Sequence, residues 1–200
     1  MKIYFASGNK HKKTEMMRLL GGIELVLPSE EGIEFDVEEN GKTFIENAII
    51  KAEALYEIVK APVIADDSGL SVNALNGAPG LFTARYGEDV LGRKLSSEEK
   101  YMYLIKNMEG IEDRRAEFIC ALCFIASPNR RYVIQEIAKG SIATAPSGVN
   151  GFGYDPVFFN DEAGMISAEL PEGDKDLYSH RGKAARIMKD IIQKTLEETT

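Results

Sequence analysis

The sequence predicts an α/β protein built on a mixed β-sheet, and two observations lead to this class. A strand-like run at residues 2–6 is followed by an amphipathic helical pattern and a second strand-like run at 23–27, which is typical of a βαβ start. Two long strand-like runs, 115–126 and 131–143, are separated by four residues and indicate an antiparallel hairpin. A sheet that holds both features is mixed rather than doubly wound and parallel.

The composition narrows the class of function. Two hundred residues suffice for one sizeable domain or for two lobes sharing a sheet, and no linker, repeat or low-complexity tract divides residues 1–200. A net charge of −8 argues against a general duplex-DNA binder, which normally carries a basic footprint. No apolar run reaches the length of a membrane span, and the first apolar residues are too few for a secretory signal. We therefore expect no nucleic-acid or membrane partner, while an anionic small ligand remains possible.

The two cysteines predict a reducing compartment. Cys120 and Cys123 lie inside a strand-like run, and no second Cys pair or nearby His pair accompanies them. A metal site or redox motif is therefore not indicated, and buried free thiols are expected. This suits a cytoplasmic protein.

The first helix opens with cations, although a helix N-terminus favours acids. After the strand at 2–6 come a short loop and then a basic first turn, and the helix continues through Met16 and Leu20 to Gly21-Gly22. Positive charge at a helix start after a Gly-containing loop suits a docked anion, and the alternative is a solvated basic turn. The loop matches neither the P-loop nor the dinucleotide-binding spacing. We predict a phosphate site of another design, formed by Ser7, Gly8, Asn9, Lys10, His11 and Lys12.

The second helix follows an acidic segment. Glu38 and Glu39 lie just before a capping-box sequence at 43–46, which starts a helix that ends before Pro62. Most acids of this segment are expected to be solvated surface residues, and one or two could reach a metal, because the start of the helix fixes Glu38 and Glu39 in place. Lys51 lies four residues after Asn47 on one helix face, and we treat it as a candidate phosphate contact.

The stretch from Pro62 to Leu70 opens with a short buried strand, which is expected to stop at Asp66-Asp67-Ser68-Gly69. Ligands of open α/β sheets bind beyond the carboxyl ends of strands. Neighbouring acids repel each other and raise each other's pKa, and a divalent cation such as Mg²⁺ removes that cost. The alternative is a simple turn at Gly69.

The remaining elements follow in order. A short strand extends to Leu75, glycine-rich loops occupy 76–80 and 84–87, and a capping box at Ser96 starts another helix. After the hairpin, the loop at 145–156 carries Phe152 and Tyr154 among glycines, so these rings could stack on a base or plug a core edge.

A strand then starts at 157, and the last helix opens with cations at Ser179-His180-Arg181-Gly182-Lys183, preceded by Lys175. Two cation-headed helix starts and a carboxylate pair are the parts of a metal–polyphosphate site. Lysines would hold phosphate oxygens, and a carboxylate would orient or deprotonate the attacking water. No Ser-His-Asp or Cys-His grouping is apparent in the sequence, so hydrolysis by activated water is the economical mechanism.

Six motifs resemble those of the inosine/xanthosine triphosphate pyrophosphatases, the HAM1-like family. They occur in order between residue 3 and about residue 190: 7–12 (SGNKHK), 43–52 (TFIENAIIKA), 65–70 (ADDSGL), 77–86 (GAPGLFTARY), 152–156 (FGYDP) and 179–182 (SHRG). The resemblance implies Mg²⁺-dependent cleavage of ITP, dITP and XTP to the monophosphate and pyrophosphate. It also implies an elongated two-lobed fold around a long mixed sheet, a site in the cleft, and a homodimer.

The resemblance also implies roles for individual residues. Residues 7–12 would cradle the phosphates, Asp67 would bind the metal and act as the base for water, and either Glu38 or Glu39 would be the second metal-linked acid. Ser68 would contact substrate, and His180 and Arg181 would read the base. The nucleotide pocket would be lined by Phe152, Gly153, Tyr154, Asp155 and Lys175. The sequence departs from the family pattern around Lys175: it has Gly173-Asp174-Lys175-Asp176, where similar members often carry Glu-Lys-Asn.

Two alternatives remain open. One is a general nucleotide pyrophosphatase acting on modified pyrimidines or other deoxynucleoside triphosphates. The other is a non-catalytic module that binds purine triphosphates. Asp67 argues against the second, because a binder would not need a carboxylate beside the phosphates.

Overall fold

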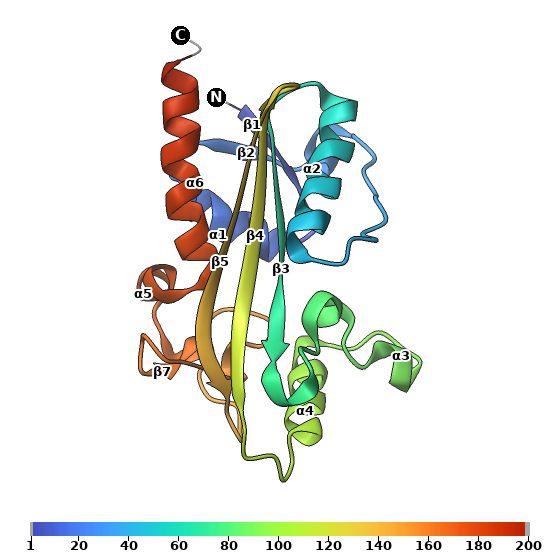
Figure 1. Cartoon of the computed structure of the whole chain (residues 1–200), viewed down its shortest axis with the longest axis vertical. Helices are drawn as coiled ribbons and strands as arrows, with labels where there is room; N and C mark the ends of the chain where they lie inside the picture. Colours follow the sequence, from blue (N-terminus) through green and yellow to red (C-terminus); the bar gives the residue numbers. More distant parts are fainter. Residues whose placement is uncertain (1, 199–200) are drawn as a thin grey trace. The chain divides into compact units, whose positions relative to one another are not determined.

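A computed structural model describes residues 2–198 and confirms the α/β class with a mixed sheet (Figure 1). Its seven strands run in the order β2-β1-β3-β4-β5-β6-β7. The strands are β1 (Lys2–Ala6), β2 (Glu24–Val26), β3 (Val63–Val72), β4 (Arg115–Ser127), β5 (Arg130–Ile142), β6 (Phe158–Asn160) and β7 (Met165–Ile166). The helices are α1 (Lys10–Leu20), α2 (Phe44–Val59), α3 (Glu88–Leu91), α4 (Ser97–Asn107), α5 (Glu172–Tyr178) and α6 (His180–Glu197).

Both kinds of strand pairing occur in the sheet. Strand β1 pairs in parallel with β2 and with β3, whereas β6 pairs antiparallel with β5 and β7. Strands β4 and β5 are neighbours joined by Pro128 and Asn129 alone, so the predicted hairpin is confirmed. No helix among residues 2–198 is long and apolar enough to cross a membrane.

The chain divides into two compact units. The first holds the described residues up to Asp67, Cys120–Glu136 and those from Arg181 onward; the second holds Ser68–Ile119 and Ile137–His180. The prediction that residues 1–200 act as one catalytic domain stays a prediction.

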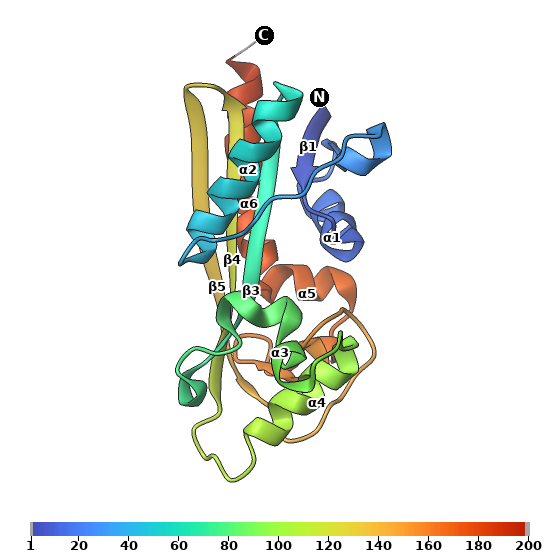
Figure 2. The same cartoon turned by 90° about the vertical axis from the view of Figure 1, so that its right-hand side faces the viewer.

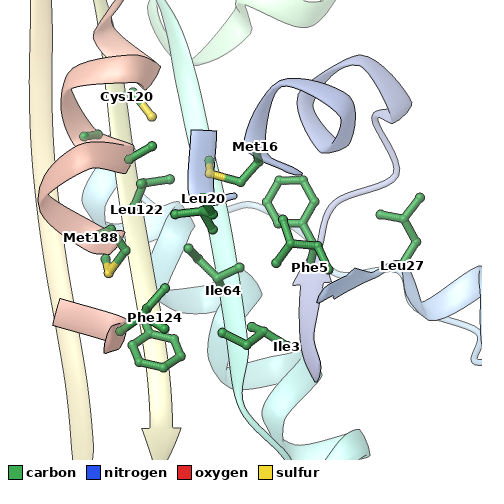
Figure 3. Close-up of a cluster of buried hydrophobic side chains, with 14 residues drawn as sticks. Ile3, Phe5, Met16, Leu20, Leu27, Ile64, Cys120, Leu122, Phe124 and Met188 are labelled. Carbon is green, nitrogen blue, oxygen red and sulfur yellow. The ribbon is translucent and has the colours of Figure 1, made fainter. Parts of the chain in front are cut away.

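In the first unit, two helices bury their apolar faces against one face of the sheet. Figure 3 shows Met16 and Leu20 of α1 and Met188 of α6 packed around side chains of β1, β3 and β4. Helix α2 lies on the opposite face of the strands from α6, as Figures 1 and 2 show together. The strand residues of this cluster are Ile3, Phe5, Leu25, Ile64, Cys120, Leu122 and Phe124.

The second unit has its own core. Leu70 and Val72 of β3 pack with Leu104 of α4, with Met108 directly after that helix, and with the rings of Tyr154 and Phe158. Tyr154 is one of these rings, and its hydroxyl donates a hydrogen bond to the carbonyl of Thr83 at 3.0 Å. Of the two roles considered for the aromatic loop, Tyr154 has the packing role.

One boundary predicted from the sequence is wrong. The acids were expected to end a strand, with a second strand running to Leu75, but β3 is continuous from Val63 to Val72 and carries Asp66 and Asp67 mid-strand. The partner strand is what ends: Ala6, the last residue of β1, pairs with Ala65. Polar side chains therefore begin on β3 where its parallel neighbour stops.

The short helix α5 was not predicted.

Substitution of Gly140 on β5 tests how closely β5 and β6 pack in the second unit. Gly140 lies opposite Asn160 in the β5–β6 pair, and a Cβ there would come within 2.1 Å of the Phe159 carbonyl oxygen and 2.6 Å of the Phe158 ring. Gly140→Ala should therefore lower the free energy of unfolding by about 2 kcal/mol through overpacking. Urea unfolding measures this. Gly173→Ala is the control because a Cβ there meets nothing within 4 Å; equal midpoints for the two variants would contradict the close approach.

The two cysteines are free and buried, as expected. Burial raises the pKa of Cys123 to about 12 and raises the pKa of Cys120 well above its usual value. Since only the thiolate reacts, both should stay protonated and inert at pH 8. We expect Ellman's reagent to titrate no thiol rapidly in the native protein and two in guanidinium chloride. Rapid native reaction of either thiol would contradict this.

Candidate functional site

The two adjacent carboxylates of β3 face opposite sides of the sheet. Successive side chains of a strand alternate between faces. Asp66 accordingly contacts Lys12 of α1 and Arg181 of α6, whereas Asp67 contacts Lys51 of α2. The mutual repulsion that suggested a shared divalent cation is thus relieved differently: Asp66 pairs with Lys12 and Arg181, and Asp67 pairs with Lys51.

Asp66 is the centre of a buried charge cluster. It is 1 % exposed, with Lys12 Nζ 2.7 Å from Oδ1 and Arg181 Nε 2.7 Å from Oδ2. Burial alone would raise the pKa of Asp66, but Arg181 and Lys12 hold it well below its usual range. The Cys120 thiol also donates to Oδ2, at 3.7 Å. Asp66 is therefore ionised and neutralised from two helices.

Arg181 has a second acidic partner that the sequence analysis did not single out. Its Nη1 lies 2.7 Å from Oε2 of Glu15, and its side chain is buried. Two carboxylates therefore fix the guanidinium plane. Glu15 is three residues after Lys12 and so lies on the same side of α1, which is the signal that could have identified it.

The start of α1 is exposed and capped by its own loop. The Asn9 Oδ1 accepts from the backbone N–H groups of His11 and Lys12 at 2.9 and 3.3 Å, and Ser7 Oγ accepts from the Asn9 N–H at 3.1 Å. Gly8 does not have a positive φ, and a Cβ there would meet nothing within 4 Å. Nothing in the described chain therefore demands glycine at this position, whereas a ligand held close to the backbone would.

On the other face of the sheet, Lys51 bridges two acids. Its Nζ lies 2.7 Å from Oδ1 of Asp67 and 2.7 Å from Oε2 of Glu39. Lys51 and Asp67 are buried, at 7 % and 8 % exposure. The structure thus favours Glu39 over Glu38 as the acid that accompanies Asp67.

The pKa values of Asp67 and Lys51 are both raised, for different reasons. Burial raises the pKa of Asp67, and the nearby Lys51 only partly opposes this. The pKa of Lys51 is raised, because Asp67 and Glu39 outweigh the effect of burial, which would lower it. Asp67 is therefore a stronger base than an exposed aspartate.

The acids fit a magnesium ion in chemical type. Among residues 2–198 no group of three or more His, Cys, Asp or Glu is gathered in the manner of a complete metal cage. Mg²⁺ in phosphate-processing sites is usually held by one or two carboxylates, with water and substrate oxygens completing the shell. Asp67 and Glu39, which share the Lys51 ammonium group in this structure, offer two carboxylates of this chemical type.

The second unit brings together a further set of predicted residues. Asp155 Oδ2 accepts from Lys175 Nζ at 2.7 Å and from the Phe152 N–H at 2.8 Å, and the Lys175 ammonium lies 5.4 Å from the Phe152 ring centroid. Gly153 lies within this loop with φ +66°. Ser68 is half-buried on β3. Asp155 and Lys175 are buried, so the pair organises the loop from within.

His180 packs against an aromatic ring rather than standing in solvent. Its imidazole stacks on Phe118 with centroids 4.7 Å apart and an interplanar angle of 10°. Phe118, from β4, was not among the predicted site residues, and its strand position gave no signal beyond an apolar core residue.

Asp66→Asn should destabilise the first unit strongly. The change leaves Lys12 and Arg181 facing an amide, and removing one partner of a buried ion pair costs about 3–5 kcal/mol. Chemical denaturation monitored by circular dichroism measures the loss. The control is Asp113→Asn, which removes an exposed pair with Arg115 and should leave the midpoint unchanged. Parental stability of Asp66→Asn would show that the cluster contributes little.

Comparisons with known proteins match this chain over nearly its whole length. The Ham1 family model matches residues 3–191. A Treponema denticola protein named dITP/XTP pyrophosphatase is 53 % identical over 184 residues, covering 92 % of this chain and 94 % of that protein. A Geobacter sulfurreducens protein of the same name is 40 % identical over 195 residues, covering 96 % of each chain.

Solved structures match over the same length. The Staphylococcus aureus Ham1 protein superposes with a TM-score of 0.85 at 35 % identity, covering 98 % of this chain and 100 % of that one. A Coxiella burnetii HAM1 protein gives a TM-score of 0.85 at 36 % identity, covering 97 % and 99 %. With the family model, the relatives and the solved structures all matching along nearly the whole chain, this protein belongs to the Ham1 family.

Proposed function

We propose that this protein hydrolyses the non-canonical purine nucleoside triphosphates ITP, dITP and XTP to the nucleoside monophosphate and pyrophosphate. The observation that carries the proposal is the buried Asp67 carboxylate, with its raised pKa, beside Lys51 and next to the Asp66–Lys12–Arg181 cluster. Relatives named dITP/XTP pyrophosphatase support the choice of substrate.

The reaction needs a general base to deprotonate the attacking water, and we assign this role to Asp67. Its carboxylate takes a proton from water as the water oxygen bonds to the α-phosphorus. The bond from that phosphorus to the bridging oxygen breaks, and pyrophosphate leaves. A carboxylate whose pKa is raised by burial accepts a proton more readily than an exposed one.

The triphosphate is assigned to the exposed start of α1. Lys10 and Lys12 supply positive charge, and Gly8 leaves room for phosphate oxygens to approach the backbone. Ser7, Asn9 and His11 complete this loop. Lys51 would neutralise phosphate charge from the Asp67 side of the sheet.

Asp67 and Glu39 would hold Mg²⁺, which when bound offsets phosphate charge and polarises phosphorus. Glu38 remains a weaker candidate because Lys51 contacts Glu39.

The nucleoside is assigned to Phe152, Gly153, Asp155 and Lys175, with Ser68 contacting substrate. Phe152, half-buried beside the Lys175 ammonium, is the ring of this loop suited to stacking on a base. Tyr154 would act through packing. His180 and Arg181 are proposed to read the base; because Arg181 already neutralises Asp66, its share of this role rests on the family resemblance alone.

We also propose that the enzyme is a cytoplasmic homodimer. The two free, buried thiols suit a reducing compartment. The homodimer is carried over from the family resemblance.

Product analysis of ITP with Mg²⁺ tests the proposal directly. Pyrophosphate and IMP are expected. Orthophosphate and IDP would place the attack elsewhere, and no turnover would favour the binding module. Rates on XTP, dITP, GTP and dUTP measured side by side separate the proposed enzyme from a general pyrophosphatase, since equal rates on GTP would remove the specificity.

Asp67→Asn should lower kcat by about 10²–10⁴-fold, because the amide cannot accept the proton from water. Pyrophosphate release from ITP at saturating substrate measures this, with circular dichroism confirming the fold. The exposed Asp113→Asn variant serves as the matched control and should keep the parental rate. Parental turnover by Asp67→Asn would rule out the assigned base.

A further inference from the structure

The acid Glu39 lies on a segment that has no regular structure to hold it. Residues 33–42, between a short 3-10 turn and α2, form neither helix nor strand. Glu39 is itself exposed, yet its carboxylate lies 2.7 Å from the buried Lys51 Nζ. An exposed side chain on an irregular segment needs an anchor if it is to keep one position.

The anchor is a hydrogen bond two residues further on. The Gly41 N–H donates to Oδ1 of Asn47 at 2.8 Å, and Asn47 is only 3 % exposed. We call this contact the Gly41–Asn47 latch. Asn47 lies one turn before Lys51 on the same side of α2, so the helix that anchors the segment also presents the ammonium that Glu39 contacts.

Gly41 fits the latch because it has no side chain. A Cβ at this position would lie 2.6 Å from Asn47 Oδ1, 2.7 Å from Glu46 Cβ and 3.0 Å from the Asn47 backbone N. Its φ is not in the positive region, so the backbone conformation itself would accept other residues. The requirement for glycine is therefore the close approach of the segment to α2.

Neighbouring contacts reinforce the latch. The Lys42 N–H donates to Oε2 of Glu46 at 2.5 Å, and the Glu46 N–H donates to Oγ1 of Thr43 at 3.1 Å. The capping sequence thus starts α2 and also ties down the chain that leads into it.

We propose that Asn47 and Gly41 are positioning residues that hold Glu39 beside Lys51 and Asp67 and thereby set the affinity of the site for its divalent cation. This rests on the proposed function in one respect, the assignment of Glu39 to the metal. Neither residue touches substrate in this proposal; both act through Glu39.

Gly41→Ala and Asn47→Ala test the latch in different ways. The first pushes the segment off α2, and the second removes the acceptor; both leave Glu39, Lys51 and Asp67 unchanged. Each should raise the Mg²⁺ concentration for half-maximal ITP turnover by about tenfold, the scale on which outer partners of metal ligands act. The value of kcat at saturating Mg²⁺ should change by less than about threefold, since the base is untouched. Gly173→Ala, where a Cβ meets nothing, should change neither quantity.

A second measurement needs no metal and no turnover. A glutamate-specific protease cleaves after Glu38 and Glu39, and release of the segment should speed the appearance of those fragments by about tenfold in both variants, as followed by mass spectrometry. Gly173→Ala should be cleaved at the parental rate. A variant that fails to fold is recognised by circular dichroism, and the other then carries the test.

The outcomes separate the two proposals. Faster cleavage with a raised Mg²⁺ requirement supports the latch and its role. Unchanged cleavage overturns the latch, and faster cleavage with an unchanged Mg²⁺ requirement overturns its link to the cation. If the parental protein does not hydrolyse ITP, the proposed function fails. Mn²⁺ binding in the presence of the imido analogue of ITP, measured by electron paramagnetic resonance, then replaces turnover. A tenfold weaker Mn²⁺ affinity in the two variants would support the latch, and an unchanged affinity would overturn it.

Discussion

The alternation of side chains along β3 is the constraint on which the rest of the candidate site depends. Because Asp66 and Asp67 are consecutive residues of one strand, their carboxylates emerge on opposite faces of the sheet and form ion pairs with different side chains. One face is covered by α1 and α6 and the other by α2 (Figures 1 and 2). Each face must therefore supply its own positive charge, and the cations found at Lys12, Arg181 and Lys51 meet that requirement.

The two faces neutralise their acids to different degrees, and this difference gives the carboxylates different chemistry. Asp66 faces two cations, so its pKa is held well below the usual range and it remains a fixed anion. Asp67 shares one cation with Glu39, so burial prevails and its pKa is raised. Environments that separate the pKa values of neighbouring acids separate their roles. Asp66 organises the two cationic helices, and Asp67 is left able to exchange a proton.

The sequence predicts most of the fold, because its elements have strong local signals. The capping residues Thr43 and Ser96 mark true helix starts, and the hairpin is found within two residues of its predicted ends. The continuity of β3 was missed because Ser68 and Gly69 resemble a turn locally, whereas the strand is held by neighbours distant in sequence. The candidate site residues were predicted from motifs, whereas the contacts of Glu15 and Phe118 and the division of the acids between two faces depend on tertiary structure.

In helix α2, two buried polar residues interrupt the apolar face, and this pattern can be recognised in the sequence. The buried residues of α2 are Phe44, Asn47, Ala48, Lys51, Ala52 and Leu55, a helical stripe with two polar members at its centre, whereas the apolar Ile58 is 53 % exposed. Hydrophobic burial alone would favour apolar side chains at positions 47 and 51. The free-energy cost of burying the polar Asn47 and Lys51 must therefore be offset by specific contacts. Asn47 has the Gly41 N–H, and Lys51 has two carboxylates. A polar pair inside an apolar stripe thus marks where a helix was selected for charge placement rather than for packing.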